Sequence, residues 1–235
     1  MSGIVAMTGF FSRLKDGTAF QLKFRDRVGA GEVLGNALKF VVKKSGGNIV
    51  LGIPRGGVIV ADIVARKLNA DFDVVIARKL TAPDNKENAI GAIMPDGSMY
   101  LDEFLVNSLK VSQGYIEDEK SVQLQELERR IQLYRPRKAG YNVKGRTVVL
   151  VDDGIATGAT VIAAARWLKK HEPARIIIAA PVAQPQAAEL LKIEADAVEV
   201  ISTPANFGSV NQFYKDFDQA TDERVLEVLK NRRLL

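Results

Sequence analysis

Val148–Thr160, with the sequence VVLVDDGIATGAT, is the stretch that decides the fold of this 235-residue chain. Its apolar start predicts a buried strand, and Asp152 and Asp153 then lie at the carboxyl edge, where open α/β sheets bind ligands. The small residues 156–160 open a helix, whose free amides and positive end suit a phosphate group. Gly158 also lets the backbone approach a ligand closely. The stretch therefore combines a phosphate-binding loop with two carboxylates suited to a ribose diol, although a capped helix with Asp153 as a turn residue is the plainer alternative.

Apolar runs and helical patterns alternate on both sides of this stretch. Continuous Val/Ile/Leu runs that alternate with helices predict an α/β fold with a doubly wound, mainly parallel sheet and helices on both faces. A hairpin is predicted where residues 89–94 and 98–101 flank Pro95-Asp96-Gly97. The strands are predicted at 48–53, 73–77, 147–151, 175–180 (ending before Pro181) and 197–201, and the helices at 58–68, 160–170 and 186–193.

The composition excludes several classes of chemistry. The chain has no Cys and one His, so thiol nucleophiles, thiolate metal sites and His clusters are ruled out. The formal net charge is +5, and residues 1–47 carry all of it with eight Lys/Arg against three acids. We interpret this as a solvated basic face beside an anion site rather than as a nucleic-acid-binding surface. No apolar run approaches the roughly 20 residues of a membrane span, so we expect a cytoplasmic protein.

The charged segment 102–134 predicts one long amphipathic helix, followed by a basic linker up to residue 146. Apolar side chains recur along it at helical spacing. This stripe packs either on its own domain or on a second subunit, and the sequence does not choose, so a homodimer is possible. The stripe consists of Leu124, Leu127, Ile131 and Tyr134.

Two further segments have the composition of anion sites. Pro54-Arg55-Gly56-Gly57 follows a strand, and its paired glycines allow backbone amides to turn toward an anion while Arg55 adds a forked donor. A glycine-rich turn between a strand and a helix is the alternative. Arg78 and Lys79 end another predicted strand, where two cations are either solvated or directed at the same ligand.

VVLVDDGIATGAT resembles the phosphoribosyl pyrophosphate (PRPP) signature of the type I phosphoribosyltransferases. The chain is also similar to a bacterial and archaeal group of predicted phosphoribosyltransferases over about residues 20–230. Residues 1–19 then form an amino-terminal extension, and 20–235 form the domain, with a helical insertion at about 102–140 and a candidate hood at 202–220. The further segments that carry this likeness are FRDR (24–27), LGIPRGG (51–57), ARKL (77–80), ENAIGA (87–92) and FYKDFDQ (213–219).

The resemblance implies roles for the site residues. Asp152 and Asp153 would bind the ribose hydroxyls, and Gly154 would also belong to the PRPP site. The 5′-phosphate would be bound by Ala156, Thr157, Gly158, Ala159 and Thr160. The pyrophosphate would meet Arg55, Gly56 and Gly57, in a loop that often holds a cis peptide, together with Arg78 and Lys79. Residues 81–88 occupy the position of a mobile catalytic loop that contains Glu87, a conceivable acid/base group. Mg²⁺ would be held mainly by PRPP, with Asp152 and Asp153 as possible ligands.

The resemblance implies transfer of ribose 5-phosphate from PRPP to a nitrogen nucleophile, expected to be a nucleobase, with release of pyrophosphate. A non-catalytic regulator that senses PRPP or a nucleotide is the alternative. Ala156 stands where the hypoxanthine–guanine branch has an Asp and where adenine-type members have Ala, which argues against an oxopurine acceptor. The aromatic residues of the candidate hood either stack on the base or belong to the core. They are Phe207, Phe213, Tyr214 and Phe217.

Overall fold

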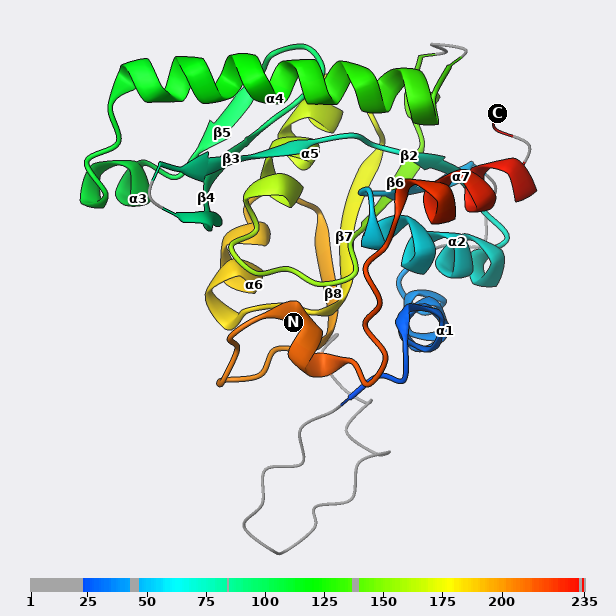
Figure 1. The fold of residues 1–235 in the computed structure, drawn as a ribbon. Coiled ribbons are helices and arrows are strands. Elements are labelled where there is room, and N and C mark those ends of the chain that lie inside the picture. Colours follow the sequence, from blue (N-terminus) through cyan, green and yellow to red (C-terminus); the bar gives the residue numbers. More distant parts are fainter. Residues whose placement is uncertain (1–22, 43–46, 84, 137–139, 233, 235) are drawn as a thin grey trace, which may run out of the picture.

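The computed structural model describes residues 23–42, 47–83, 85–136, 140–232 and 234, so the predicted extension 1–19 lies outside them. A five-stranded sheet forms the centre of the fold (Figure 1), and each neighbouring pair of its strands is parallel. The prediction of a parallel α/β fold is therefore confirmed. In spatial order the strands are β2 (Asp71–Val74), β1 (Asn48–Gly52), β6 (Thr147–Val151), β7 (Arg175–Val182) and β8 (Ala197–Ser202).

Helices cover both faces of this sheet, because its strands are apolar on both sides. In β6, Val149 and Val151 belong to one buried cluster, while Val148 and Leu150 belong to the other. This is the alternation that a strand imposes on successive side chains. The first cluster is closed by α1 (Arg27–Leu38), α2 (Gly56–Leu68) and α7 (Asp222–Asn231), and the second by α5 (Ala159–Lys169) and α6 (Pro185–Leu191).

A second, antiparallel sheet contains β3 (Arg78–Ala82), β4 (Asn85–Ile93) and β5 (Met99–Leu101). The β4–β5 pair is the hairpin predicted around residues 95–97. The predicted loop at 81–88 is wrong, because Thr81 pairs with Ala89 and Ala82 with Asn85 in a β3–β4 hairpin. The strand predicted at 73–77 is also displaced along the sequence, because β2 begins at Asp71 and ends at Val74.

Strand β7 continues through Pro181, where the sequence predicted its end. Pro lacks a backbone N–H and is tolerated only where the ladder does not need that donor. The last residue of β6 pairs with Ala179, so β7 has passed the end of its neighbour by residue 181. The strand therefore extends to Val182, which still pairs with Ser202 of β8.

The segment 102–134 forms two helices, α3 (Glu103–Ser108) and α4 (Gln113–Tyr134), where one was predicted. The Asp102 side chain accepts a hydrogen bond from the Leu105 amide and caps α3. The Ser112 side chain accepts one from the Tyr115 amide and starts α4. Between the two helices, Lys110 has a φ of 51°, a left-handed conformation that interrupts a helix.

The apolar stripe of α4 is covered within a single chain. Leu127 and Tyr134 are each only 1% exposed, and Leu124 and Ile131 pack against the same buried cluster. Helix α4 crosses the molecule above β3 and reaches α7 at its carboxyl end (Figure 1). The stripe therefore does not need a second subunit, and the argument that it pointed to a homodimer is corrected. Within the part of the chain that the structure describes, no helix has both the length and the apolar composition to cross a bilayer.

Candidate functional site

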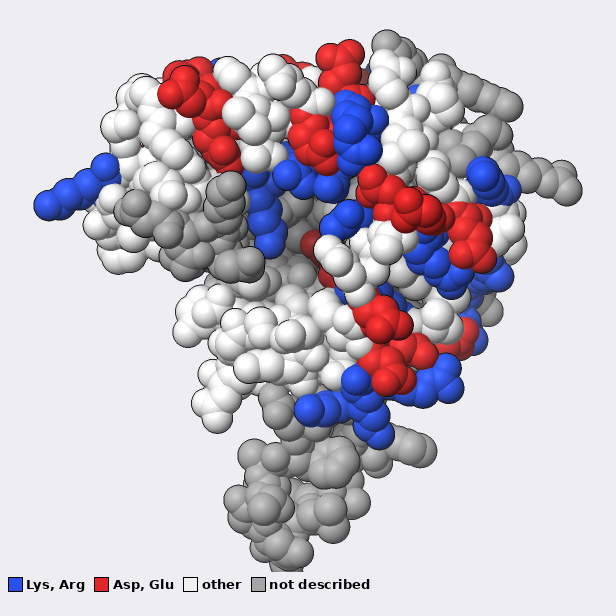
Figure 2. Space-filling view, in the orientation of Figure 1, with Lys and Arg blue, Asp and Glu red and all other residues white. Residues whose placement is uncertain are grey.

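A cavity opens where the order of the parallel strands reverses. β1 and β6 are neighbours, with Gly52 opposite Val151, but their connections lead to opposite halves of the sheet. The loops that leave the two strands consequently separate and form a crevice, which is where open α/β sheets bind ligands. The cavity has a volume of about 430 Å³. Figure 2 shows it as a hollow below α4, with basic side chains around its rim and acidic atoms in its depth.

The β6–α5 loop forms one side of this cavity. The amides of Asp152 and Ile155 donate to the carbonyls of Ala179 and Val182 in β7, at 3.3 Å and 2.9 Å, which fixes the path of the loop. Gly158 precedes α5 with a φ of 82°, a conformation that favours glycine. The N-cap residue Gly158 makes no side-chain capping bond, and the Ala159 amide has only a long 3.5 Å contact to Thr157 Oγ1 among the described side chains. All of the predicted phosphate-loop residues line the cavity: Gly154, Ala156, Thr157, Gly158, Ala159 and Thr160.

The β1–α2 loop forms the opposite side. The Pro54–Arg55 peptide bond is cis, and Arg55 precedes α2 without a capping side chain. A Cβ atom at Gly56 would overlap the Asp153 carboxylate, and one at Gly57 would lie 2.9 Å from the Asp152 Cα. Two glycines are therefore needed because the two loops approach closely. Arg55 and Gly56 line the cavity, whereas Gly57 is buried behind them.

The two helices that begin at the cavity, α2 and α5, have N-cap residues that make no side-chain capping bond, unlike the other long helices. The first amides of a helix have no partner within it, so a side chain, water or a ligand must satisfy them. Among the described α-helices, α6 also lacks a capping side chain, but Pro occupies its first turn. The remaining four are capped by Asp26 (α1), Asp102 (α3), Ser112 (α4) and Thr221 (α7).

The two aspartates differ in their surroundings. Burial, and next the charge of Asp153, raise the pKa of Asp152 well above its ordinary value, while the charge of Lys79 opposes the rise. Asp153 is instead paired, since Arg27 Nε donates to its Oδ2 at 2.7 Å, and these side chains are only 10% (Arg27) and 15% (Asp153) exposed. Asp153 therefore has a charged partner within the fold.

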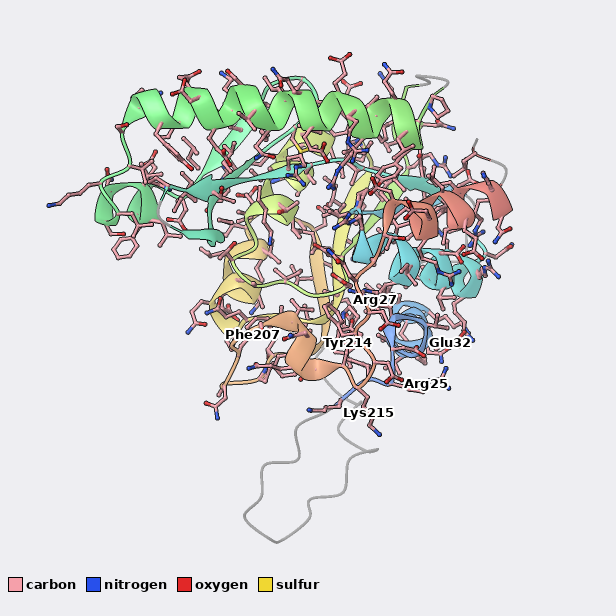
Figure 3. The ribbon with its side chains drawn as sticks, viewed as in Figure 1. Arg25, Arg27, Glu32, Phe207, Tyr214 and Lys215 are labelled. Atoms are coloured by element: carbon pink, nitrogen blue, oxygen red, sulfur yellow. The ribbon has the colours of Figure 1, made fainter. Side chains whose placement is uncertain are left out.

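Arg27 is a site residue whose role sequence reasoning missed, although it lies within the quoted FRDR motif. Its Nη1 donates to the Asp218 carbonyl at 2.7 Å, and its guanidinium lies 3.9 Å above the Phe217 ring. In Figure 3, Arg27 at the start of α1 lies close to Tyr214. Arg27 therefore fixes Asp153 at the cavity and covers one face of the Phe217 ring.

Two of the other proposed stacking residues lie in the core. Phe213 is 1% and Tyr214 4% exposed, in a small cluster with Phe24. Phe213 belongs to η1 (Val210–Phe213), and the Tyr214 hydroxyl donates to the Asp153 carbonyl at 2.5 Å. Phe207 is half-buried and stacks on Phe213. The prediction that Phe213 and Tyr214 stack on a base does not fit this geometry, because neither ring is accessible.

Four cations line the cavity: Arg55, Arg78, Lys79 and Arg130. The last of these was not predicted, and it comes from α4 together with Gln123, which accepts a hydrogen bond from Arg78 Nε at 2.9 Å. Burial, and next the charge of Arg130, lower the pKa of Arg78. The helical insertion thus forms part of the wall.

The β3–β4 hairpin also reaches the cavity, through Thr81. The Thr81 amide and hydroxyl both donate to Glu119 of α4, at 3.1 Å and 2.9 Å. Tyr115 of the same helix donates to the Thr81 carbonyl at 3.0 Å. The side chain of Glu87, the proposed acid/base group, lies outside the described residues.

The carboxylate pair is the candidate site for a divalent cation. Among the described residues, no group of three or more His, Cys, Asp or Glu side chains could hold a metal by itself. Mg²⁺ commonly binds through one or two carboxylates, with the remaining ligands from substrate phosphates and water. Asp152 and Asp153, which line the cavity beside the two uncapped helix ends, fit that arrangement.

Comparisons with known proteins cover most of the chain. A family model of the phosphoribosyl transferase domain matches residues 36–218. Two relatives from strains of Mycobacterium tuberculosis, each called "Putative phosphoribosyl transferase", are 37% identical over 206 residues, or 88% of this chain and 46% of theirs. The chain therefore spans about half the length of those relatives. The crystal structure of TT1426 from Thermus thermophilus is 42% identical and has a TM-score of 0.74, covering 89% of this chain and 99% of that one.

Proposed function

Since this chain belongs to the phosphoribosyl transferase family, we propose that it transfers ribose 5-phosphate from PRPP to a nitrogen nucleophile, with Mg²⁺, and releases pyrophosphate. One observation carries the proposal: two uncapped helix ends face one cavity, with a carboxylate pair between them. PRPP has a matching arrangement, with a phosphate at one end of the ribose, a diphosphate at the other and two hydroxyls between. The acceptor that we propose is a nucleobase-like molecule.

The β6–α5 side holds the sugar phosphate. The first amides of α5 and the hydroxyls of Thr157 and Thr160 donate to the 5′-phosphate, where the helix end also favours negative charge. Asp152 and Asp153 accept hydrogen bonds from the ribose hydroxyls. Because Arg27 already donates to Oδ2 of Asp153, the other oxygen of that carboxylate is directed to the sugar.

The β1–α2 side and the cationic wall hold the diphosphate. The nitrogen of the acceptor attacks C1 of the ribose on the face opposite the diphosphate. As the new C–N bond forms, the C1–O bond breaks, and its electron pair leaves with pyrophosphate. Arg55, Arg78 and Lys79 stabilise the negative charge that develops on the leaving group. The configuration at C1 is inverted, and the proton of the acceptor nitrogen leaves to water or to the departing pyrophosphate.

Mg²⁺ held by the diphosphate oxygens, with Asp152 and Asp153 as protein ligands, would neutralise part of the leaving group's charge. The protein's own contribution is geometric. Three anchoring regions fix the two phosphate groups and the diol, so the acceptor meets C1 in one orientation. Water would compete with the acceptor for C1, so exclusion of water from the cavity would favour transfer over hydrolysis.

Pyrophosphate release from PRPP and Mg²⁺, measured across a panel of purines, pyrimidines and small amines, tests this function. We expect release to depend on one class of acceptor, with adenine-like bases favoured over oxopurines because Ala156 offers no carboxylate to an oxopurine. Tight PRPP binding with no release under any acceptor would favour the PRPP-sensing regulator. Absence of PRPP binding would contradict both the transferase and a regulator that senses PRPP.

A further inference from the structure

Arg130 is the least expected side chain in the wall of the cavity. It lies near the carboxyl end of α4, in the helical insertion, and its side chain is only 9% exposed. It nevertheless lines the cavity together with Arg55 and Arg78. A guanidinium that is kept from bulk water but faces a polar cavity is a ready partner for an anion.

The guanidinium of Arg130 is held in place from one side. Its Nε donates to Glu126 Oε1 at 2.8 Å, and this is its one recorded hydrogen bond to the described residues. Glu126 is shared with Arg129, whose Nε and Nη2 donate to it at 2.7 Å and 3.0 Å. These bonds, chiefly the one from Arg129, lower the pKa of Glu126 to about 2. The carboxylate therefore stays ionised at neutral pH and orients Arg130, whose terminal nitrogens are left for another acceptor.

Asp222 of α7 links the same network to the β1–α2 loop. It accepts hydrogen bonds from the Tyr134 hydroxyl at 2.5 Å and from Arg129 at 3.0 Å. Arg55 Nη1 lies 3.6 Å from the same carboxylate. The loop that we propose to bind diphosphate is thus coupled to the end of α4 that carries Arg130.

Three like charges meet in this part of the wall. Burial lowers the pKa of Arg78, and the charges of Arg130 and Arg55 lower it further. Glu126 and Asp222 compensate part of this charge from behind the wall, while the cavity that all three cations line leaves room for an anion on the other side. A diphosphate carries more charge and more acceptor oxygens than a monoanion, so it is the better match for a wall of several cations.

We propose that Arg130 binds the diphosphate of PRPP and of released pyrophosphate, so that the helical insertion supplies part of the substrate site. The proposal rests on the proposed function for its ligand. Gln123, which accepts a hydrogen bond from Arg78 Nε, acts as a positioning residue that turns Arg78 toward the same group. Helix α4 therefore contributes one direct contact and orients a second.

Calorimetric titration with pyrophosphate and Mg²⁺, and separately with ribose 5-phosphate, tests the assignment. Arg130→Gln removes the charge and should weaken pyrophosphate binding about 10- to 100-fold, as expected for loss of a charged hydrogen bond. Ribose 5-phosphate binding should change less than about twofold, because that ligand lacks the diphosphate. Arg130→Lys should also weaken pyrophosphate binding, since an ammonium does not reproduce the forked geometry.

Arg129→Gln is the matched control. Arg129 is the preceding residue on the same helix and binds the same Glu126, but its side chain is 50% exposed and it is not among the residues that line the cavity. It should leave pyrophosphate affinity within about twofold of the wild type. Equal losses in the Arg129 and Arg130 variants, or a loss for both ligands in Arg130→Gln, would overturn the assignment. If Arg130→Gln does not fold, unchanged pyrophosphate binding in Arg130→Lys would overturn it instead.

These titrations, read together with the pyrophosphate-release assay, separate the assignment of Arg130 from the proposed function. Wild-type protein that binds pyrophosphate through Arg130, yet releases none from PRPP with any acceptor, would contradict the transferase and leave the Arg130 contact standing. Wild-type protein that does not bind pyrophosphate would overturn the Arg130 contact directly.

Discussion

The two sides of the cavity are built in different ways. The β6–α5 side comes from one continuous stretch, 148–160, whose order of apolar, acidic and small residues already specifies a strand, two carboxylates and a helix start. The opposite wall combines β1–α2, β3 and α4, and two of its cations, Arg55 and Arg130, lie 75 positions apart. The first side is a local motif, whereas the second exists only after the chain has folded.

This difference determines what each side depends on. The β6–α5 loop is fixed by backbone bonds to β7 and by the conformation of Gly158, and its remote side-chain contacts, from Arg27 and Tyr214, meet it at Asp153. The wall depends on how α4 packs, because Gln123 and Arg130 reach the cavity only if the apolar stripe of α4 is seated. Mutations in the packing of α4 should therefore alter diphosphate binding, while the phosphate loop remains intact.

The largest expected effect tests the packing of the wall. Leu127→Ala removes a side chain that is 1% exposed, and we expect it to lower the free energy of unfolding by about 2–5 kcal/mol. Val122→Ala, on an exposed position of the same helix, should change it by less than about 0.5 kcal/mol. Urea denaturation measures both. Light scattering should give the same mass for both variants and the wild type, and a halved mass in the Leu127 variant would show that the stripe lies between subunits.

The next largest effect concerns the pair that joins α1 to the carboxylate side. Arg27→Met leaves Asp153 unpaired and removes the bond to the Asp218 carbonyl, so we expect a loss of about 2–3 kcal/mol, since water can reach Asp153 through the cavity. Arg25→Met is the control, because the Arg25 side chain is 77% exposed and, within the described part of the chain, its ion pair is with the neighbouring Asp26. Equal stability of the two variants in urea would show that the Arg27–Asp153 pair is not structural.

Two substitutions, one on each side of the cavity, should differ in which ligand they bind more weakly. Arg55→Ala should weaken PRPP binding about 10- to 100-fold and leave ribose 5-phosphate binding unchanged, because only PRPP carries the diphosphate. Thr157→Val should weaken both ligands by a similar factor of about 3 to 10, because both share the 5′-phosphate. Calorimetry with the two ligands gives the answer. The division of the cavity fails if Arg55→Ala weakens both ligands equally.

The smallest effect concerns pH. A carboxyl with a raised pKa in the folded chain stabilises the fold below its unfolded pKa, and this contribution is lost as the pH rises through the folded value. The pKa of Asp152 is raised, so Asp152→Asn should be more stable than the wild type near neutral pH, and this advantage should shrink toward about pH 4. It should also bind PRPP more weakly. Melting temperatures across this range test it, with exposed Asp118→Asn as control, and a pH-independent difference would contradict a buried, destabilised Asp152.

Much of what is encoded locally could be predicted from the sequence, although the β3–β4 hairpin and the break between α3 and α4 could not. The parallel strands, the hairpin around residues 95–97 and the helix starts at the two loops follow from periodicity and from the position of glycines. Arg27 could not be paired with Asp153 in this way, because 126 positions separate them. Arg130 gave no signal, because a charged residue on an amphipathic helix is ordinarily solvated. The aromatic residues Phe213 and Tyr214 were ambiguous for the same reason, since only packing decides whether a ring is accessible.

The central claim is that the two uncapped helix ends hold the two phosphate groups of one ligand. A crystal structure with PRPP and Mg²⁺ tests it most directly. The account predicts the 5′-phosphate at the amides of 156–160, the diphosphate beside Arg55 and Arg130, and the ribose hydroxyls at Asp152 and Asp153. A ligand bound in the reverse orientation, or with its diphosphate away from the start of α2, would contradict it.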